Sequence, residues 1–172
     1  SLGNINAVRG GEIAIGSPGV NPWLGLDDNR VYVFYGGLKE GNAIAQESSG
    51  PASLNLAVKK ADVTIIGPVG SAFGSTVARA GDIDGGDSDL IIGAPYADQV
   101  YIFFGGKRTG KAIDFSHQGG IDVDIPGGGP FDLMIHGEDG SGFGSYLSAM
   151  GDVNLSLYSS LAVSAPSTSS PK

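Results

Sequence analysis

The chain has 172 residues, no cysteine and a net charge of −8. This length predicts one domain with a hydrophobic core, and the lack of cysteine excludes a disulfide scaffold, a thiol nucleophile and thiolate zinc ligands. Acidic residues outnumber basic ones, so the chain lacks the basic surface that a nucleic-acid-binding protein needs. No apolar run reaches the roughly 18 residues of a membrane span. Neither nucleic-acid binding nor membrane insertion is therefore expected.

The first third of the chain predicts three strands. Residues 13–18, 31–37 and 63–67 are rich in β-branched and aromatic side chains and are bounded by glycine, proline or aspartate. This composition is typical of short strands that alternate with tight turns.

The loop between the first two of these strands is a candidate binding loop. Residues 19–29 form a much longer connection than its counterpart at 96–99, and they include the chain's only tryptophan. In a repeat array, insertions on one face often form the binding face. Trp23, Asp27 and Asp28 are therefore candidate ligand-binding residues for a protein or glycan. The alternative is that Trp23 caps the side of a packed sheet.

The middle of the chain predicts four strands, near residues 73–80, 89–94, 99–104 and 131–136. They have the same β-branched and aromatic composition and the same glycine, proline and aspartate boundaries. Strands this short, separated by turns, are typical of an all-β protein.

The loop that joins the first two of these four strands is strongly acidic. Its eight residues contain four carboxylates, those of Asp82, Asp84, Asp87 and Asp89. Like charges this close repel one another, and a cation that prefers oxygen removes the repulsion, since Ca²⁺ takes six to eight oxygen ligands. The loop is therefore a predicted calcium site, with a solvated acidic turn as the alternative.

The predicted strands repeat along the chain with an offset of 69 or 70 residues. Residues 72–75 return at 142–145, and residues 31–37 return at 100–106. The final segment, 138–172, contains the first two strands of a further repeat. Four separate segments share this period, which makes chance a poor explanation.

Four strands per repeat form the blade of a β-propeller. The sequence thus predicts an all-β fold and a single domain, 1–172, that is a β-propeller segment of four-stranded antiparallel blades. It would hold nine strands, or about two and a quarter blades. A partial blade spans 1–67, a full blade spans 68–137 and a second partial blade spans 138–172.

Two short motifs carry a family resemblance. Phe73-Gly74 followed by Gly93-Ala94-Pro95 resembles the FG-GAP repeat of the integrin α-subunit propeller and of bacterial surface proteins, and residues 81–98 are close to the bacterial version. The resemblance covers nearly the whole chain. It implies blades of a propeller that usually has seven, with calcium loops on one face and ligand-binding loops on the other.

The resemblance also implies an order of ligands in the acidic loop. The family pattern places oxygens at loop positions 1, 3 and 5, a backbone carbonyl at 7 and a carboxylate at 9. Asp82 and Asp84 match positions 1 and 3. The loop is one residue shorter than the pattern and has Gly86 where an acid is expected, so Asp87 or a water would substitute, with Asp89 as the closing carboxylate.

A second loop has the full family spacing and much less charge. It contains Asp152, Asn154, Ser156, the carbonyl of Tyr158, and Ser160. Because calcium affinity depends on the number of charged ligands, this loop is expected to be a weaker second site.

These observations predict a calcium-binding FG-GAP propeller module for adhesion or ligand binding at an extracellular or cell surface. The alternative is a structural spacer or scaffold propeller within a larger secreted enzyme or toxin. Fewer than three blades cannot close a ring. Either a homo-oligomer or the remaining blades of a larger chain would therefore complete it.

No enzymatic activity is expected. Gly86-Asp87-Ser88 resembles a serine element of some esterases, but it lies inside the acidic loop, and only His117 and His136 could serve as its base. Residues 105–111 match the glycine and lysine spacing of a phosphate-binding loop. The next residue, Ala112, has no hydroxyl to hold magnesium.

Overall fold

The structure, a computed structural model, describes residues 11–19, 28–36, 61–106, 113, 121–124 (backbone) and 131–167. Over these ranges it contains ten strands in three sheets. None of these residues belongs to a helix of the length and hydropathy that crossing a bilayer requires.

The second sheet is the four-stranded repeat that the sequence predicts. Its order is β4-β5-β6-β8, and every neighbouring pair is antiparallel. The strands are β4 (Thr76–Gly81), β5 (Asp89–Ala94), β6 (Gln99–Phe103) and β8 (Leu133–His136). All six residues of β5 are buried, because this strand is covered on both of its faces.

The first sheet departs from the prediction of purely antiparallel blades. It contains the three expected strands, β1 (Ile13–Ser17), β2 (Arg30–Phe34) and β3 (Val63–Ile66), and a fourth, β7 (Ile121–Asp124), in the order β1-β2-β3-β7.

Strand β7 is the tenth strand, which the sequence analysis missed, and it pairs with β3 in parallel. It comes from the segment that connects β6 to β8 in the second sheet. The strand has only four residues, in which isoleucine and valine alternate with aspartate. These four residues are the whole of its sequence signal. Its pairing depends on the edge that β3 offers, which the local sequence does not reveal.

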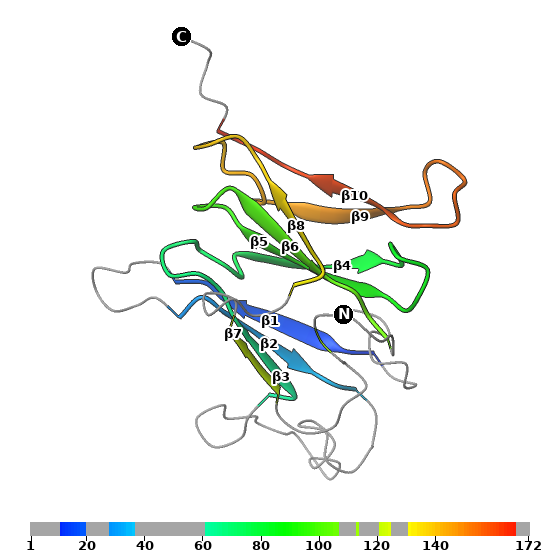
Figure 1. Cartoon of the computed structure of the whole chain (residues 1–172), viewed down its shortest axis with the longest axis horizontal. Helices are drawn as coiled ribbons and strands as arrows, with labels where there is room; N and C mark the ends of the chain where they lie inside the picture. Colours follow the sequence, from blue (N-terminus) through cyan, green and yellow to red (C-terminus); the bar gives the residue numbers. More distant parts are fainter. Residues whose placement is uncertain are drawn as a thin grey trace, which may run out of the picture.

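The third sheet consists of β9 (Leu147–Gly151) and β10 (Ser160–Val163), which are antiparallel. These two strands confirm the prediction that the last repeat supplies two. The three sheets are stacked one above another (Figure 1), but the described residues do not form a closed ring.

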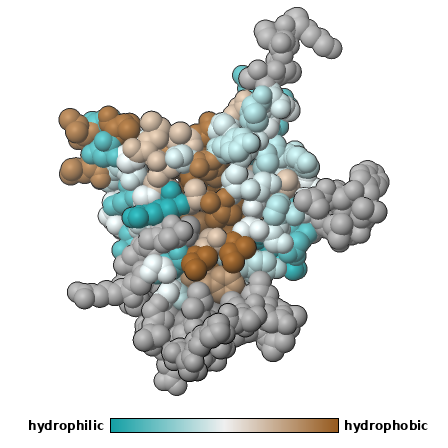
Figure 2. Space-filling model, turned by 180° about the vertical axis from the view of Figure 1, so that it is seen from behind, coloured by the Kyte–Doolittle hydropathy of each residue, from teal (hydrophilic) through white to brown (hydrophobic). Residues whose placement is uncertain are grey.

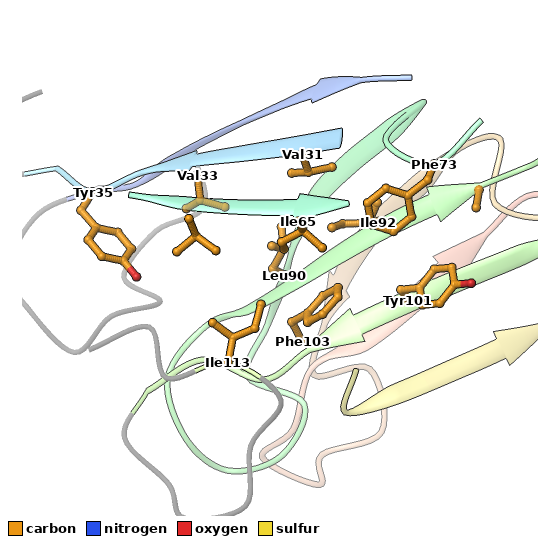
Figure 3. Close-up of a cluster of buried hydrophobic side chains, with 12 residues drawn as sticks. Val31, Val33, Tyr35, Ile65, Phe73, Leu90, Ile92, Tyr101, Phe103 and Ile113 are labelled. Carbon is orange, nitrogen blue, oxygen red and sulfur yellow. The ribbon is translucent and has the colours of Figure 1, made fainter. Parts of the chain in front are cut away.

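The first and second sheets enclose the main hydrophobic core. Val31 and Ile65 of the first sheet meet Leu90, Ile92 and Phe103 of the second, and all five are buried (Figure 3). Burying an aliphatic or aromatic side chain of this size contributes about 1.5–3 kcal/mol. The contact between sheets is therefore a principal source of stability.

The opposite face of the second sheet forms a second core with the third sheet. Ile91, Val100 and Ile102 are buried there, and Leu147 and Leu161 pack against them. Since neighbouring residues of a strand point to opposite faces, the run Leu90-Ile91-Ile92 serves both cores. This explains why β5 is apolar at consecutive positions.

The phenylalanine–glycine pairs lie where one sheet meets the next. A Cβ atom added to Gly16 would overlap the carbonyl oxygen of Gly74, and one added to Gly93 would overlap that of Gly144. The same carbonyl of Gly144 accepts a hydrogen bond from Thr76 Oγ1 (2.7 Å). The first and second sheets thus each have a glycine against which the phenylalanine–glycine loop of the next sheet packs.

Phe73 packs in the core between the first and second sheets. Its ring is fully buried and lies against Gly67, where a Cβ would overlap it. The ring of Tyr101 meets it edge-on, with centroids 5.4 Å apart and an interplanar angle of 72°. Phe143 lies in the same way against Gly137.

Candidate metal centre

The acidic loop begins as β4 ends and is folded around the carboxylate of Asp82. Asp82 Oδ1 accepts hydrogen bonds from the backbone N–H groups of Gly85 (2.6 Å) and Gly86 (2.8 Å). Gly85 has a φ of 88°, a conformation that glycine adopts without the cost imposed on other residues. The two glycines therefore let the backbone curl round the carboxylate.

Asp89 closes the loop from the first position of β5. Its side chain is fully buried. Asp89 Oδ2 accepts a hydrogen bond from Ile83 N–H (2.6 Å), and Oδ1 accepts one from Gly105 N–H (2.9 Å). A buried carboxylate needs such partners. Asp89 thus has a fixed position, and it links the acidic loop to the residues that follow β6.

Three of the four predicted carboxylates come together. Asp82, Asp84 and Asp89 each offer an oxygen atom, and these atoms lie within 4.8 Å of one another. Calcium–oxygen bonds are 2.3–2.6 Å long, so ligands of one ion lie up to roughly 5 Å apart. Because each carboxylate oxygen has two acceptor sites, the hydrogen bonds to Asp82 and Asp89 are compatible with coordination. This geometry fits one shared cation.

Asp87 is not part of this group. Its side chain lies against Gly106, where an added Cβ would meet the carboxylate. The expectation that Asp87 replaces the missing acid at Gly86 therefore lacks support from the geometry. Of the two predicted substitutes, a water molecule would therefore supply that ligand to a cation in this loop.

The loop between β9 and β10 keeps its shape through hydrogen bonds. Asp152 Oδ1 accepts from Ser156 N–H (2.9 Å), and Oδ2 accepts from Leu157 N–H (2.8 Å). Asn154 Oδ1 also accepts from Ser156 N–H (3.2 Å), and Ser156 Oγ accepts from Tyr158 N–H (3.4 Å). Backbone amides therefore hold the single carboxylate of the predicted second site, which also includes Ser160, as they hold Asp82 and Asp89 in the first. The expectation that this site is the weaker one rests on its smaller number of carboxylates.

The two loops touch each other. The N–H group of Ser159 donates to the carbonyl oxygen of Asp82 (2.6 Å). The Ser159 hydroxyl lies beside Gly81, where a Cβ would overlap it. Ser159 of the second loop therefore fixes the backbone of Asp82, the first candidate metal ligand.

The predicted ligand-binding residues are only partly described. Trp23 and Asp27 lie outside the described residues. Asp28 is half-buried and forms an ion pair with Arg30 (2.7 Å), and it accepts a hydrogen bond from the hydroxyl of Tyr32 (3.2 Å). These contacts fix the end of the long loop at the start of β2.

One carboxylate that the sequence analysis did not single out has an evident structural role. Asp98, in the turn after β5, accepts hydrogen bonds from the N–H groups of Gly140 (2.6 Å), Gly142 (2.7 Å) and Phe143 (3.2 Å) and from the Ser141 hydroxyl (3.1 Å). Partial burial raises the pKa of Asp98, but these hydrogen bonds to its charged form lower it below the usual aspartate value.

The repeat itself contains a signal for Asp98. Asn29 stands 69 residues earlier, and both residues have a positive φ, 43° for Asn29 and 53° for Asp98. Asn29 Oδ1 accepts a hydrogen bond from Gly19 N–H (3.2 Å). Among residues other than glycine, asparagine and aspartate best tolerate this backbone conformation, and their side chains bond to nearby amides. The pair therefore marks a shared turn.

Comparison with known proteins gives a partial match. No protein-family model matches the chain. The chain is 32% identical over 126 residues to integrin alpha-3 of Cricetulus griseus and, to the same extent, to integrin alpha-3 of Mus musculus. The match covers 72% of this chain and 10% of each relative, so the chain spans about a tenth of the length of the curated relatives it matches. It confirms a distant similarity to the FG-GAP propeller region of an integrin α-subunit.

Proposed function

From its similarity to integrin alpha-3, we propose that this chain is a calcium-stabilised FG-GAP propeller module for adhesion or ligand binding at an extracellular surface. The observation that carries the proposal is the grouping of Asp82, Asp84 and Asp89 within 4.8 Å in one loop. A loop with this many carboxylates gains stability when a cation binds, because their mutual repulsion becomes coordination.

Calcium is the favoured ion on chemical grounds. The loop offers only oxygen ligands, and calcium accepts six to eight of them in irregular geometry, whereas magnesium demands a strict octahedron. Three carboxylates and one shortened turn favour an extracellular type of site, with a dissociation constant of about 10⁻⁴–10⁻³ M.

The loops at the other end of the strands favour a binding role. Val69, in the loop before β4, and Tyr96, in the turn after β5, are both strongly exposed. Hydrogen bonds from the 140–143 loop to Asp98 hold the neighbouring turn in place. A fixed loop face with exposed apolar side chains suits recognition of a protein or glycan.

The contacts of Ser88 also favour a binding module over an enzyme. Ser88 is buried, and its hydroxyl accepts a hydrogen bond from Arg79 Nε (3.0 Å). His136 faces Gln99, with 3.4 Å between Nδ1 and the amide nitrogen. A serine nucleophile needs a base within hydrogen-bonding reach, and these contacts give both side chains structural partners instead.

The test is thermal unfolding with calcium or with a chelator. At a calcium concentration about a hundred times the dissociation constant, binding stabilises the fold by about 2.7 kcal/mol. For a chain of this size that corresponds to a rise in Tm of roughly 5–10 °C. The double variant Asp82→Asn with Asp84→Asn should lose this rise.

The matched control is Asp87→Asn, which removes one charge from the same loop outside the carboxylate group. It should keep the calcium-dependent rise in Tm. An equal rise in the double variant would place the ion elsewhere, and an equal rise with magnesium would contradict the choice of calcium.

A further inference from the structure

We propose that the β9–β10 loop docks this molecule onto the surface of a lipid bilayer when the neighbouring acidic loop holds calcium. This is attachment at the interface, without a spanning segment. The proposal rests on the proposed calcium site, and the experiment below separates the failure of one from the failure of the other.

The tip of the β9–β10 loop is apolar and fully presented to solvent. Leu155 is 90% exposed and Leu157 is 89% exposed, and Val153 and Tyr158 beside them are exposed as well. Figure 2, which views the molecule from behind, shows apolar side chains gathered at a projecting corner. Apolar side chains concentrated in one surface patch mark an interaction site.

The two leucines adopt an unfavourable backbone conformation. Leu155 has a φ of 59° and Leu157 a φ of 73°, a backbone region that is unfavourable for residues other than glycine. Gly85 holds the position equivalent to Leu155 in the complete repeat. The hydrogen bonds to Asp152 keep the strained loop in this shape, so the leucines project from a rigid support.

Further strands added to the third sheet would not cover this tip. The second sheet has all four strands of its repeat, and the tip of its own loop, Gly85 and Gly86, is still exposed. The equivalent tip in the third sheet therefore faces outward by its place in the fold. Its leucines are not core residues that await a partner strand.

The tip is coupled to the acidic loop. Ser159, four residues after Leu155, donates its N–H to the carbonyl oxygen of Asp82 (2.6 Å). Both loops lie on the same side of the molecule (Figure 1). An ion bound by Asp82, Asp84 and Asp89 would therefore sit beside the surface that the leucines approach.

Charge explains why calcium controls the attachment. Without an ion, the three carboxylates repel the phosphate groups of lipid head groups. Residues 131–167, which include the leucine tip, contain no lysine or arginine. The nearby Arg79 donates its Nε–H to Ser88 of the acidic loop. A bound calcium ion cancels two of the three negative charges of the carboxylate group. The coordination positions that the loop leaves open accept phosphate oxygens.

A bilayer fits this tip better than a protein pocket does. The tip is convex and belongs to a single loop, whereas a specific protein interface needs about 1,000 Å² with polar groups that fix its orientation. Leucine side chains need only to enter the acyl boundary. The half-exposed ring of Tyr158 suits the head-group level, where aromatic side chains are enriched.

The experiment is cosedimentation of the intact chain with phosphatidylcholine vesicles that contain a minor fraction of phosphatidylserine, in calcium or in chelator. We expect binding in calcium only. The variant Leu155→Asn with Leu157→Asn, in which asparagine tolerates the positive φ, should bind roughly tenfold more weakly or not at all. Tyr146→Asn, at an exposed aromatic residue next to the end of β9 that is farther from the tip, is the matched control and should bind like the wild type.

The change in Tm that calcium causes is measured on the same samples. A calcium-dependent rise in Tm without vesicle binding overturns the docking proposal and leaves the calcium site standing. Vesicle binding that persists in chelator, or that survives the leucine substitutions, also overturns it. If calcium changes neither Tm nor vesicle binding, the calcium site itself is wrong.

Discussion

At the scale of single residues, Asp98 determines how the second and third sheets are connected. Its carboxylate lies in the turn after β5 and binds the loop that leads into β9. The hydrogen bonds to the ionised form outweigh the effect of partial burial, so the pKa of Asp98 is lowered. A lowered pKa in the folded state means that the charged group stabilises the fold.

We predict that this contribution disappears in acid. The stabilisation by Asp98 is fully present above the pKa of the unfolded state and is lost as pH falls through the lower pKa of the folded state. Asp98→Asn keeps the shape of the side chain, as Asn29 does in the first repeat, and removes the charge. The variant should be less stable than the wild type at neutral pH, and the difference should shrink as pH falls below about 4.

Chemical denaturation across this pH range measures the difference. Asp139→Asn changes an exposed charge in the adjoining loop and should show no comparable trend. A difference between wild type and Asp98→Asn that stays constant from neutral pH to acid would show that the charge of Asp98 contributes nothing.

At the scale of strands and loops, the glycine of β5 determines how closely two sheets approach. Gly93 lies against the carbonyl of Gly144 and the hydroxyl of Thr76, and Gly16 of β1 has the equivalent contact with Gly74. Backbone atoms fill the space that a Cβ would need. The glycine is therefore required by packing and not by its own φ.

We predict that Gly93→Ala destabilises the protein by about 1–3 kcal/mol, the usual cost of overpacking. The methyl group has to displace the backbone of Gly144 and would weaken the hydrogen bond from Thr76 Oγ1. Urea denaturation measures the loss in the free energy of unfolding.

The control is Ser164→Ala, at the position in the last repeat that corresponds to Gly93. Ser164 already has a Cβ, so the change adds no atoms to the contact. It should lower the free energy of unfolding by less than about 1 kcal/mol, which is what the loss of one exposed hydrogen bond costs. If Gly93→Ala were as mild as Ser164→Ala, close approach of the two sheets would not depend on the missing side chain.

At the scale of the whole molecule, the outer face of the first sheet resembles an interface. Ile13 and Ile15 occupy the repeat positions of Leu90 and Ile92, which are fully buried between sheets. Ile13 is 46% exposed and Ile15 is 50% exposed. These side chains have the character of a surface that another sheet covers, either from a second copy or from the rest of a longer chain.

We therefore predict concentration-dependent self-association of the chain. The variant Ile13→Thr with Ile15→Thr keeps a β-branched side chain at both positions of β1 and removes apolar surface. It should reduce association in sedimentation velocity while changing Tm little, because both residues are half-exposed. A monodisperse wild-type monomer at all concentrations would contradict the prediction, as would a variant that associates equally.

The sequence by itself determined nine of the ten described strands. Strands such as β5 and β6 are continuous apolar segments between turn residues, and their signal is local. The positions of Asp82, Asp84 and Asp89 as one candidate site also followed from the sequence, since all three lie in a single short loop. Local chain geometry is enough to bring such residues together.

Only the tertiary structure decided which distant segments meet. Strand β7 joins the first sheet because β3 has an edge to pair with, and no property of residues 121–124 identifies that partner. Asp87 lies against Gly106 and is not one of the grouped carboxylates. Asp98 acquires its role from a loop more than forty residues away. Contacts of this kind depend on the arrangement of whole sheets, which is fixed by burial of apolar surface throughout the molecule rather than by any local pattern.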